Sequence, residues 1–214
     1  MNGPRHVASY YAATANPHES HPQLTADIDC DVCVVGAGFT GLSAALNLAE
    51  RGYDVVVLEA ERVGWGASGR NGGQINTGYS PGMAAARRLL GPDDAKRLWD
   101  MAEESKAIIV DRVERHRIAC DLSFGFFYAA SKPAHMDDFR DEQRLMEEVY
   151  DYRKLRLLDR AEAGAAMGTE RFAGALSDSG AGHLHPLNYT LGLAEAAVAA
   201  GVRIFEDKIG RAHV

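Results

Sequence analysis

Residues 31–59 read DVCVVGAGFTGLSAALNLAERGYDVVVLE, and this stretch decides the fold. The apolar run at 31–35 predicts a short strand, 42–51 a helix, and the apolar run at 55–58 a second strand. Three glycines, Gly36, Gly38 and Gly41, form a G-x-G-x-x-G pattern where the first strand would turn into the helix. This pattern at the first turn of a strand, helix and strand is typical of a nucleotide-binding βαβ unit.

Each position of the motif has a physical task. Gly36 permits the tight turn, Gly38 lets a pyrophosphate approach the backbone, and Gly41 lets the helix pack closely against the strands. The start of the helix offers unpaired N–H groups to the phosphates. Glu59 ends the second strand, 18 residues after Gly41, and we expect it to accept hydrogen bonds from ribose hydroxyls. Its carboxylate would repel a 2′-phosphate, which disfavours NADP.

A second glycine cluster follows Glu59. Five glycines occupy the ten positions 64–73, and such a cluster indicates turns with positive φ or a close approach of the backbone to a ligand. A generic NAD domain has no need of this loop, whereas the longer FAD molecule continues past the first turn toward its isoalloxazine ring. We therefore expect FAD as the cofactor. The residues expected on its pyrophosphate and flavin side are Arg62, Ser68, Arg70, Asn71, Gly72 and Gly73.

Four segments are distinctive beyond these motifs: SYYAA at 9–13, CDVCVVG at 30–36, GASGRNGG at 66–73 and GHLHPLN at 182–188. Through them the chain resembles the amine-oxidising, FAD-dependent oxidoreductases of the D-amino-acid-oxidase type, from about residue 9 to about residue 206. The resemblance implies an FAD-binding domain interleaved with a substrate domain. It also implies a small-molecule amine as substrate, and oxygen or another acceptor that reoxidises the flavin.

Composition narrows the classes of partner. The chain has 214 residues, 46% of them hydrophobic, and a formal net charge of −7. This acidic balance argues against nucleic acid or an anionic membrane surface as the main partner. No apolar run approaches the length of a membrane span, and the N-terminus lacks the apolar core of a signal peptide. We therefore expect a cytoplasmic location.

Cysteines and histidines do not indicate a metal or redox site. Cys30 and Cys33 form C-x-x-C, but residues three apart in a strand face opposite sides of the sheet. With Cys120 they are expected to be reduced thiols in the core. His183 and His185 would share one face of a strand at 182–185, yet no third ligand is evident nearby. Ordinary hydrogen bonding is the favoured role for both histidines, and no metal is expected.

The rest of the chain alternates between predicted helices and strands. Residues 79–90 read as a linker with some helix, and Pro92 with the following acidic residues predicts a helix start. The helix that starts near Pro92 is expected to run to 116. Further helices are expected at 133–151, 160–167 and 186–200, and strands at 124–130, 155–158, 173–176, 182–185 and 202–205.

The fold class that follows is α/β. A Rossmann-like FAD-binding βαβ domain at 29–78, with a return at 181–206, is interleaved with part of an α+β substrate domain at 79–180. An N-terminal arm at 1–28 precedes both. Residues 209–214 match one reading frame of a widely used sequencing adapter. We therefore expect a C-terminally truncated chain with a non-native tail at 207–214, which binds FAD weakly, if at all, when expressed alone.

The predicted function is FAD-dependent oxidation of an amine. A hydride would pass from the carbon bearing the amine to flavin N5, and the imine would hydrolyse to an aldehyde. No catalytic residue is assigned. Other amines and D-amino acids remain open as substrates. An NAD-linked dehydrogenase is the alternative, and the glycine cluster at 64–73 argues against it.

Overall fold

The computed structural model describes residues 6–80 and 82–207 and divides into two compact units. Unit 1 comprises the chain up to Gly73, residues 110–122, and the chain from Leu184 onward. Unit 2 comprises residues 74–109 and 123–183. Each unit is therefore built from segments far apart in the sequence. The sequence had placed 110–122 in the substrate-side region, whereas the structure includes it in unit 1. Apart from Asp207, the expected non-native tail lies outside the described residues.

Unit 1 contains a parallel sheet of three strands in the order β1-β2-β7. The strands are β1 (Val32–Val35), β2 (Val55–Leu58) and β7 (Arg203–Phe205). Helix α2 (Phe39–Glu50) connects β1 to β2, and α7 (Pro186–Ala199) leads into β7. Two shorter elements complete the unit, α1 (Tyr10–Ala13) and the 3-10 helix η1 (Ala67–Gly69). The predicted βαβ unit is thus confirmed, with its helix beginning three residues earlier than expected.

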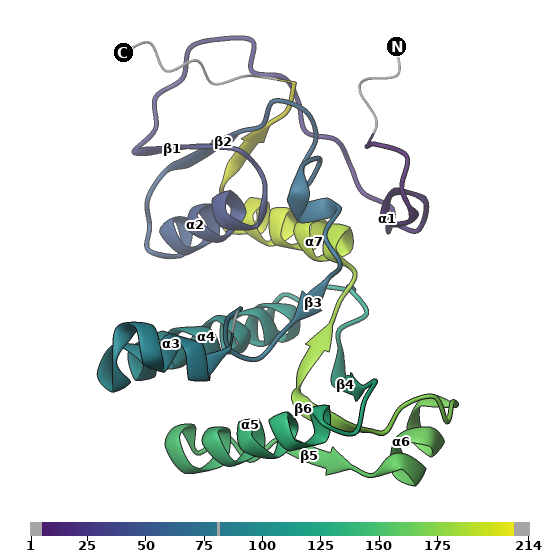
Figure 1. Ribbon diagram of the computed structural model, residues 1–214. Coiled ribbons are helices and arrows are strands. Elements are labelled where there is room, and N and C mark those ends of the chain that lie inside the picture. The colour runs from purple at the N-terminus through teal and green to yellow at the C-terminus, as the bar shows by residue number, and fades with distance from the viewer. Residues whose placement is uncertain (1–5, 81, 208–214) are drawn as a thin grey trace. The chain divides into compact units, whose positions relative to one another are not determined.

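One face of this sheet is buried against α2 and α7, which lie side by side (Figure 1). Val34, Val57 and Ile204 are register partners on that face, and Val57 and Ile204 are at most 3% exposed. A Cβ placed on Gly41 of α2 would lie 3.3 Å from a methyl group of Val34, which shows how closely the helix approaches. This burial of branched side chains is the main stabilising contribution to the sheet.

The cysteines differ from the prediction. All three are free, but only Cys120 is buried, while Cys33 is exposed and Cys30 half-buried. Cys33 shares a β1 face with Val35, which is 67% exposed, because alternate residues of a strand point the same way. The expectation that Cys33 is a core thiol is wrong, because its side of β1 is the one that α2 does not cover.

Unit 2 is built around an antiparallel sheet with the long strand β6 (Gly174–His183) at its centre. Strand β4 (Ser123–Ala130) pairs along one edge of β6, and β5 (Leu155–Leu158) and β3 (Gln74–Ile75) pair with the other. The helices are α3 (Met83–Leu90), α4 (Pro92–Arg115, whose last turns belong to unit 1), α5 (His135–Tyr150) and α6 (Arg160–Met167). A core cluster containing Trp99, Met146, Tyr150 and Leu176 joins helices to sheet.

Strand β6 replaces the two separate strands expected at 173–176 and 182–185. No strand was expected between 177 and 181, but the chain stays extended through these residues. Gly180 is required here because a Cβ would lie 2.2 Å from the hydroxyl of Tyr152. Glycine within this strand therefore allows a close approach of another part of the chain.

His183 and His185 lie in different elements. Strand β6 ends at His183, and His185 is the N-cap of α7, directly before Pro186. Nδ1 of His185 accepts a hydrogen bond from the N–H of Asn188 at 3.1 Å, so Nε2 carries the proton and donates to Thr14 at 3.0 Å. The prediction that both histidines share one face of a strand is wrong, whereas the predicted ordinary hydrogen-bonding role is confirmed for His185. Pro186 ends the strand and favours the first turn of the helix.

Candidate functional site

The first glycine turn is compact and tied to the sheet. Gly36 adopts φ +99°, a conformation that favours glycine, and its N–H donates to the carbonyl of Leu58 at 2.8 Å. A Cβ on Gly41 would lie 1.9 Å from the carbonyl oxygen of Gly36, so only glycine allows α2 to start this close to the turn. Both glycines therefore have the tasks that the motif assigns to them.

The N-terminus of α2 is open to an anion. Gly38 is the N-cap, with extended backbone and no side chain to bond the first turn, and that turn contains no acidic residue. Ser68 of the second glycine loop accepts the N–H of Phe39 through Oγ at 3.0 Å. The other N–H groups of the first turn have no partners within the helix and carry its positive end. This arrangement is suited to a phosphate group.

Glu59 is held in a fixed position at the carboxyl end of β2. Its Oε2 accepts the N–H of Ala37 at 2.7 Å, and its Oε1 accepts the N–H of Glu61 at 3.0 Å. A carboxylate has about four acceptor positions, so both oxygens retain capacity for hydroxyl donors. The two backbone bonds orient the carboxylate beside the glycine turn, where the sequence places the ribose.

The second glycine loop packs against protein more than was expected. The N–H of Gly64 donates to the carbonyl of Ala37 at 3.0 Å, which joins this loop to the first turn. Three of its glycines allow close protein packing: a Cβ on Gly64 would crowd Thr190, one on Gly69 would lie 2.1 Å from the carbonyl oxygen of Gly64, and one on Gly73 would lie 2.0 Å from that of Leu184. The loop is therefore a folded element seated on α7, with η1 inside it.

The remaining predicted residues lie along this loop. The guanidinium of Arg70 is exposed, stacks over the ring of Trp65 at 4.9 Å and donates to the carbonyl of Gly66. Asn71 donates to the carbonyls of Ala67 and Ser68, and its Oδ1 accepts the N–H of Gly73 at 2.7 Å. Gly72 is exposed. Their contacts to a cofactor remain predictions.

Arg62 and Glu206 form an ion pair that the sequence did not reveal. Glu206 is 2% exposed, and its carboxylate accepts from Arg62 at 2.6 Å, from the N–H of Val63 at 2.8 Å and from the N–H of His21 at 3.0 Å. Arg62 also lies 3.3 Å from Asp207. Glu206 directly follows β7, and an acidic residue after an apolar strand was the one available signal. The pair fixes the start of the second loop to the third strand.

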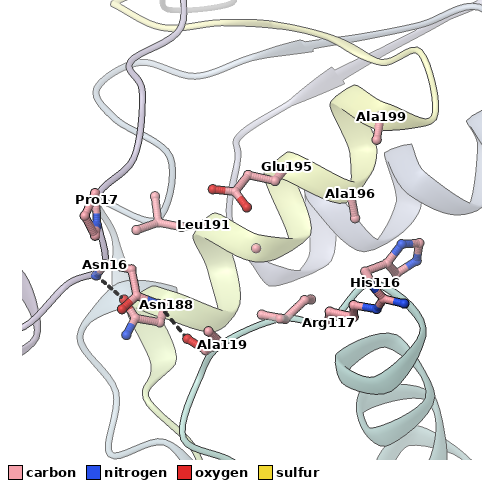
Figure 2. Close-up of a pocket in the computed structure, with 12 residues that line it drawn as sticks. Asn16, Pro17, His116, Arg117, Ala119, Asn188, Leu191, Glu195, Ala196 and Ala199 are labelled. Atoms are coloured by element: carbon pink, nitrogen blue, oxygen red, sulfur yellow. Dashed lines mark hydrogen bonds between the residues drawn. The ribbon is translucent and has the colours of Figure 1, made fainter.

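A separate cavity of about 370 Å³ lies in unit 1, between the N-terminal arm, α7 and residues 116–119 (Figure 2). Asn16 crosses it, with its N–H donating to Asn188 at 2.8 Å and its side chain donating to the carbonyl of Ala119 at 2.7 Å. None of the predicted cofactor residues lines this cavity. We therefore assign the cavity to the anchoring of the arm.

The residues present fit the ADP half of FAD. The N-cap glycine without a side chain, the glycine turn and the oriented carboxylate of Glu59 are three separate observations at one end of the sheet. Among residues 6–80 and 82–207, no group of three metal-binding side chains occurs, and no helix is long and apolar enough to cross a membrane.

Comparison with known proteins agrees with this geometry. Residues 31–212 match the family model of FAD dependent oxidoreductases, DAO. The chain is 44% identical over 201 residues to gamma-glutamylputrescine oxidoreductase of Escherichia coli, covering 94% of the chain and 47% of that protein. It is 45% identical over 202 residues to a probable oxidoreductase, OrdL, of Haemophilus influenzae, with the same coverage. The chain thus spans about half the length of the curated relatives it matches.

Solved structures show the same fold. Glycine oxidase from Geobacillus kaustophilus matches with a TM-score of 0.68 at 24% identity, over 83% of this chain and 46% of that one. L-amino acid deaminase from Proteus vulgaris matches with a TM-score of 0.70 at 21% identity, over 89% of this chain and 43% of that one. With the family match over most of the sequence, the chain belongs to the DAO family of FAD-dependent oxidoreductases.

Proposed function

We propose that the protein represented by this chain oxidises a small-molecule amine, with FAD as cofactor, and that its substrate is gamma-glutamylputrescine in putrescine breakdown. The substrate rests on the 44% identity to gamma-glutamylputrescine oxidoreductase over 94% of the chain. The cofactor half of the proposal is carried by one observation, the open N-terminus of α2 beside the oriented carboxylate of Glu59.

The chain's own residues bind and orient the cofactor. The N–H groups at the start of α2 hold the pyrophosphate, and Glu59 accepts from the ribose hydroxyls. The loop at 64–73 supplies Ser68, Arg70 and Asn71 on the side toward the flavin. Bound FAD would supply the hydride acceptor for the carbon bearing the amine, and water would then hydrolyse the imine to an aldehyde and a released amine or ammonia. No described residue is assigned as a proton acceptor.

The proposal includes the division of labour within the chain. Residues 29–78 and 181–206 would form the FAD-binding domain, and 79–180, apart from residues 110–122 of unit 1, would form part of the substrate domain. A cytoplasmic location, the absence of a nucleic-acid partner, and oxygen or another small acceptor as the oxidant belong to the same proposal. The net charge of −7 supports the exclusion of nucleic acid.

Glu59→Ala in the complete protein tests the cofactor half. Loss of a charged hydrogen bond should weaken FAD binding by about 1.5–3 kcal/mol, measured by titrating the apoprotein and following flavin fluorescence. Glu61→Ala is the matched control, because Glu59 bonds the backbone of Glu61 and not its side chain. Circular dichroism of both apoproteins checks folding. An unchanged FAD affinity in Glu59→Ala would remove Glu59 from the site.

An amine panel tests the substrate half. Gamma-glutamylputrescine, putrescine, glycine and several D-amino acids would be scored for aldehyde or keto-acid formation, and for peroxide when oxygen is the acceptor. We expect turnover of gamma-glutamylputrescine to exceed that of the others. Preference for a D-amino acid would retain the FAD chemistry and overturn the substrate. Turnover that depends on NAD, with no flavin absorbance, would overturn both.

A further inference from the structure

Unit 2 holds a cavity that none of the expected cofactor residues lines. Its volume is about 670 Å³, and it lies between α5, residues 74–80 and 82–83, and the sheet of unit 2. Its walls are largely apolar, and they include Met83, Phe126, Phe139, Met146, Leu155 and Leu176. A cavity of this size and lining is typical of a small-molecule site.

The charged part of the lining is acidic, beside neutral amide and hydroxyl side chains. Three carboxylates reach the cavity, from Asp138, Glu142 and Asp178, and no Lys, Arg or His is among its described lining residues. Lys106 pairs with Glu103 at 2.6 Å and not with one of these three carboxylates. It is connected to Asp178 indirectly, through the hydroxyls of Thr77 and Tyr152 and through the carbonyl of Gly180. The cavity therefore lacks a cation of its own.

Asp178 is fully buried, and only one of its two carboxylate oxygens has hydrogen-bond partners among the described residues. Its Oδ1 accepts three hydrogen bonds, from the hydroxyl of Tyr152 at 2.6 Å and from the N–H groups of Gly180 and Ala181 at 2.8 and 3.2 Å. Its Oδ2 is equally buried and has no hydrogen-bond partner among the described residues. A buried carboxylate oxygen without a donor is costly to the folded state. A donor in the cavity would remove that cost.

Asp138 and Glu142 break a local rule on α5. Like charges four residues apart on a helix repel each other, and no described side chain pairs with either of them. The neighbouring acids behave differently: Asp137 pairs with Arg140, and Asp141 pairs with Arg144 at 2.6 Å. Asp137 and Asp141, each one position before a cavity residue, thus form ion pairs with arginines. Asp138 and Glu142, which line the cavity, form none among the described residues.

Two of the carboxylates, Asp178 and Glu142, also act on a common neighbour, Tyr128. Burial raises the pKa of Tyr128, and the charges of Asp178 and Glu142 raise it further, so both carboxylates lie near the Tyr128 phenol. Burial likewise raises the pKa of Glu142. Aromatic rings of Phe126, Tyr128 and Phe139 surround the same space, and rings of this kind attract organic cations through their faces.

We propose that this cavity is a binding site for an alkylammonium ion, with Asp178 Oδ2 and the Glu142 carboxylate accepting the N–H donors and the apolar wall holding the alkyl chain. An ammonium group has three donors and no acceptor, which matches carboxylate acceptors with no Lys, Arg or His among the described lining residues. The site lies wholly in unit 2 and does not depend on the FAD-binding proposal, so each can fail without the other.

Calorimetric titration of the purified protein with n-butylammonium chloride tests the site, and 1-butanol serves as the neutral analogue. We expect the ammonium to bind and 1-butanol to bind at least tenfold more weakly. Glu142→Gln and Asp178→Asn should each weaken butylammonium binding tenfold or more. Asp141→Asn, which removes the same charge from an exposed position of α5, should leave binding within twofold.

The proposal is overturned if butylammonium does not bind, if 1-butanol binds as tightly, or if Glu142→Gln binds as the parent does. It is equally overturned if Asp141→Asn weakens binding as much as Glu142→Gln, since attraction would then come from overall charge. Asp178→Asn also disturbs the bonds to Tyr152 and Gly180, so its folding must be checked. Glu142 has no such bonds among the described residues, and Glu142→Gln decides the matter if Asp178→Asn does not fold.

Discussion

At the scale of single residues, Glu206 joins segments of unit 1 that lie far apart in the sequence. One buried carboxylate accepts from a side chain on the second loop, from the backbone beside it and from the N-terminal arm. Three segments far apart in the sequence thus meet at one group. A group of this kind is expected to contribute to stability out of proportion to its size, because removing its charge affects three donors at once.

We predict that Glu206→Gln lowers the free energy of unfolding by about 1.5–3 kcal/mol, the value of hydrogen bonds to a buried charge. Urea denaturation followed by circular dichroism measures the change. Asp207→Asn is the control, because Asp207 lies further from Arg62, at 3.3 Å, and is more exposed. The idea fails if both variants lose the same amount.

The thiols should differ in reactivity. The thiolate is the form that reacts with alkylating agents, and burial raises the pKa of Cys120 to about 11. Cys33 is exposed, although burial and Cys30 raise its pKa as well. We predict that iodoacetamide at pH 8 modifies Cys33 well before Cys120, as read by mass spectrometry of peptides. Urea should abolish the difference, and equal rates in the folded protein would contradict it.

At the scale of elements, close packing decides where glycine is needed within helices. Gly192 lies in α7, where a Cβ would approach the side chain of Ile118 to 2.3 Å. Gly164 lies in α6, where a Cβ would meet only ordinary contacts at 3.7 Å or more. Replacing glycine by alanine should therefore change the free energy of unfolding in opposite directions in the two helices.

We predict that Gly164→Ala stabilises the protein by about 0.5–1 kcal/mol, since alanine favours the helix. Gly192→Ala should destabilise it by about 1–3 kcal/mol, because Ile118 is branched at Cβ and cannot move aside without strain. Thermal and urea unfolding of each single variant provide the measurement. Stabilisation by Gly192→Ala would mean that α7 and residues 110–122 are packed less closely than described.

The elements predicted from sequence were those encoded by local patterns. The strand, glycine turn and helix at 31–59 were predictable because each residue's task depends on its near neighbours. Strand β6 was not predicted as one continuous strand, because the need for glycine at position 180 depends on contact with Tyr152, 28 positions earlier. The second glycine loop was recognised as special, but three of its glycines pack against protein, which depends on residues 184–190. Arg62 was expected to face phosphate, and its partner Glu206 lay too far along the sequence to be foreseen.

At the scale of the whole molecule, the chain covers less than half of each relative, and the face of β1 that carries Val35 is exposed. We predict that the 214-residue chain retains less FAD than a protein of the relatives' full length. Flavin absorbance after gel filtration of both proteins, loaded with equal FAD, measures this. Stoichiometric flavin in the shorter chain would contradict the prediction.

The interleaving of the two units has a consequence for the order of folding. Strand β7 pairs with β2 between residues 147 positions apart, as Val56 and Arg203 are, and all of unit 2 lies within that interval. Contacts between distant residues are slow to form because the loop between them must be closed first. During synthesis, β1, α2 and β2 therefore leave the ribosome well before their third strand, β7. The residues of unit 2 also emerge before β7, and folding of unit 2 shortens the effective loop between β2 and β7.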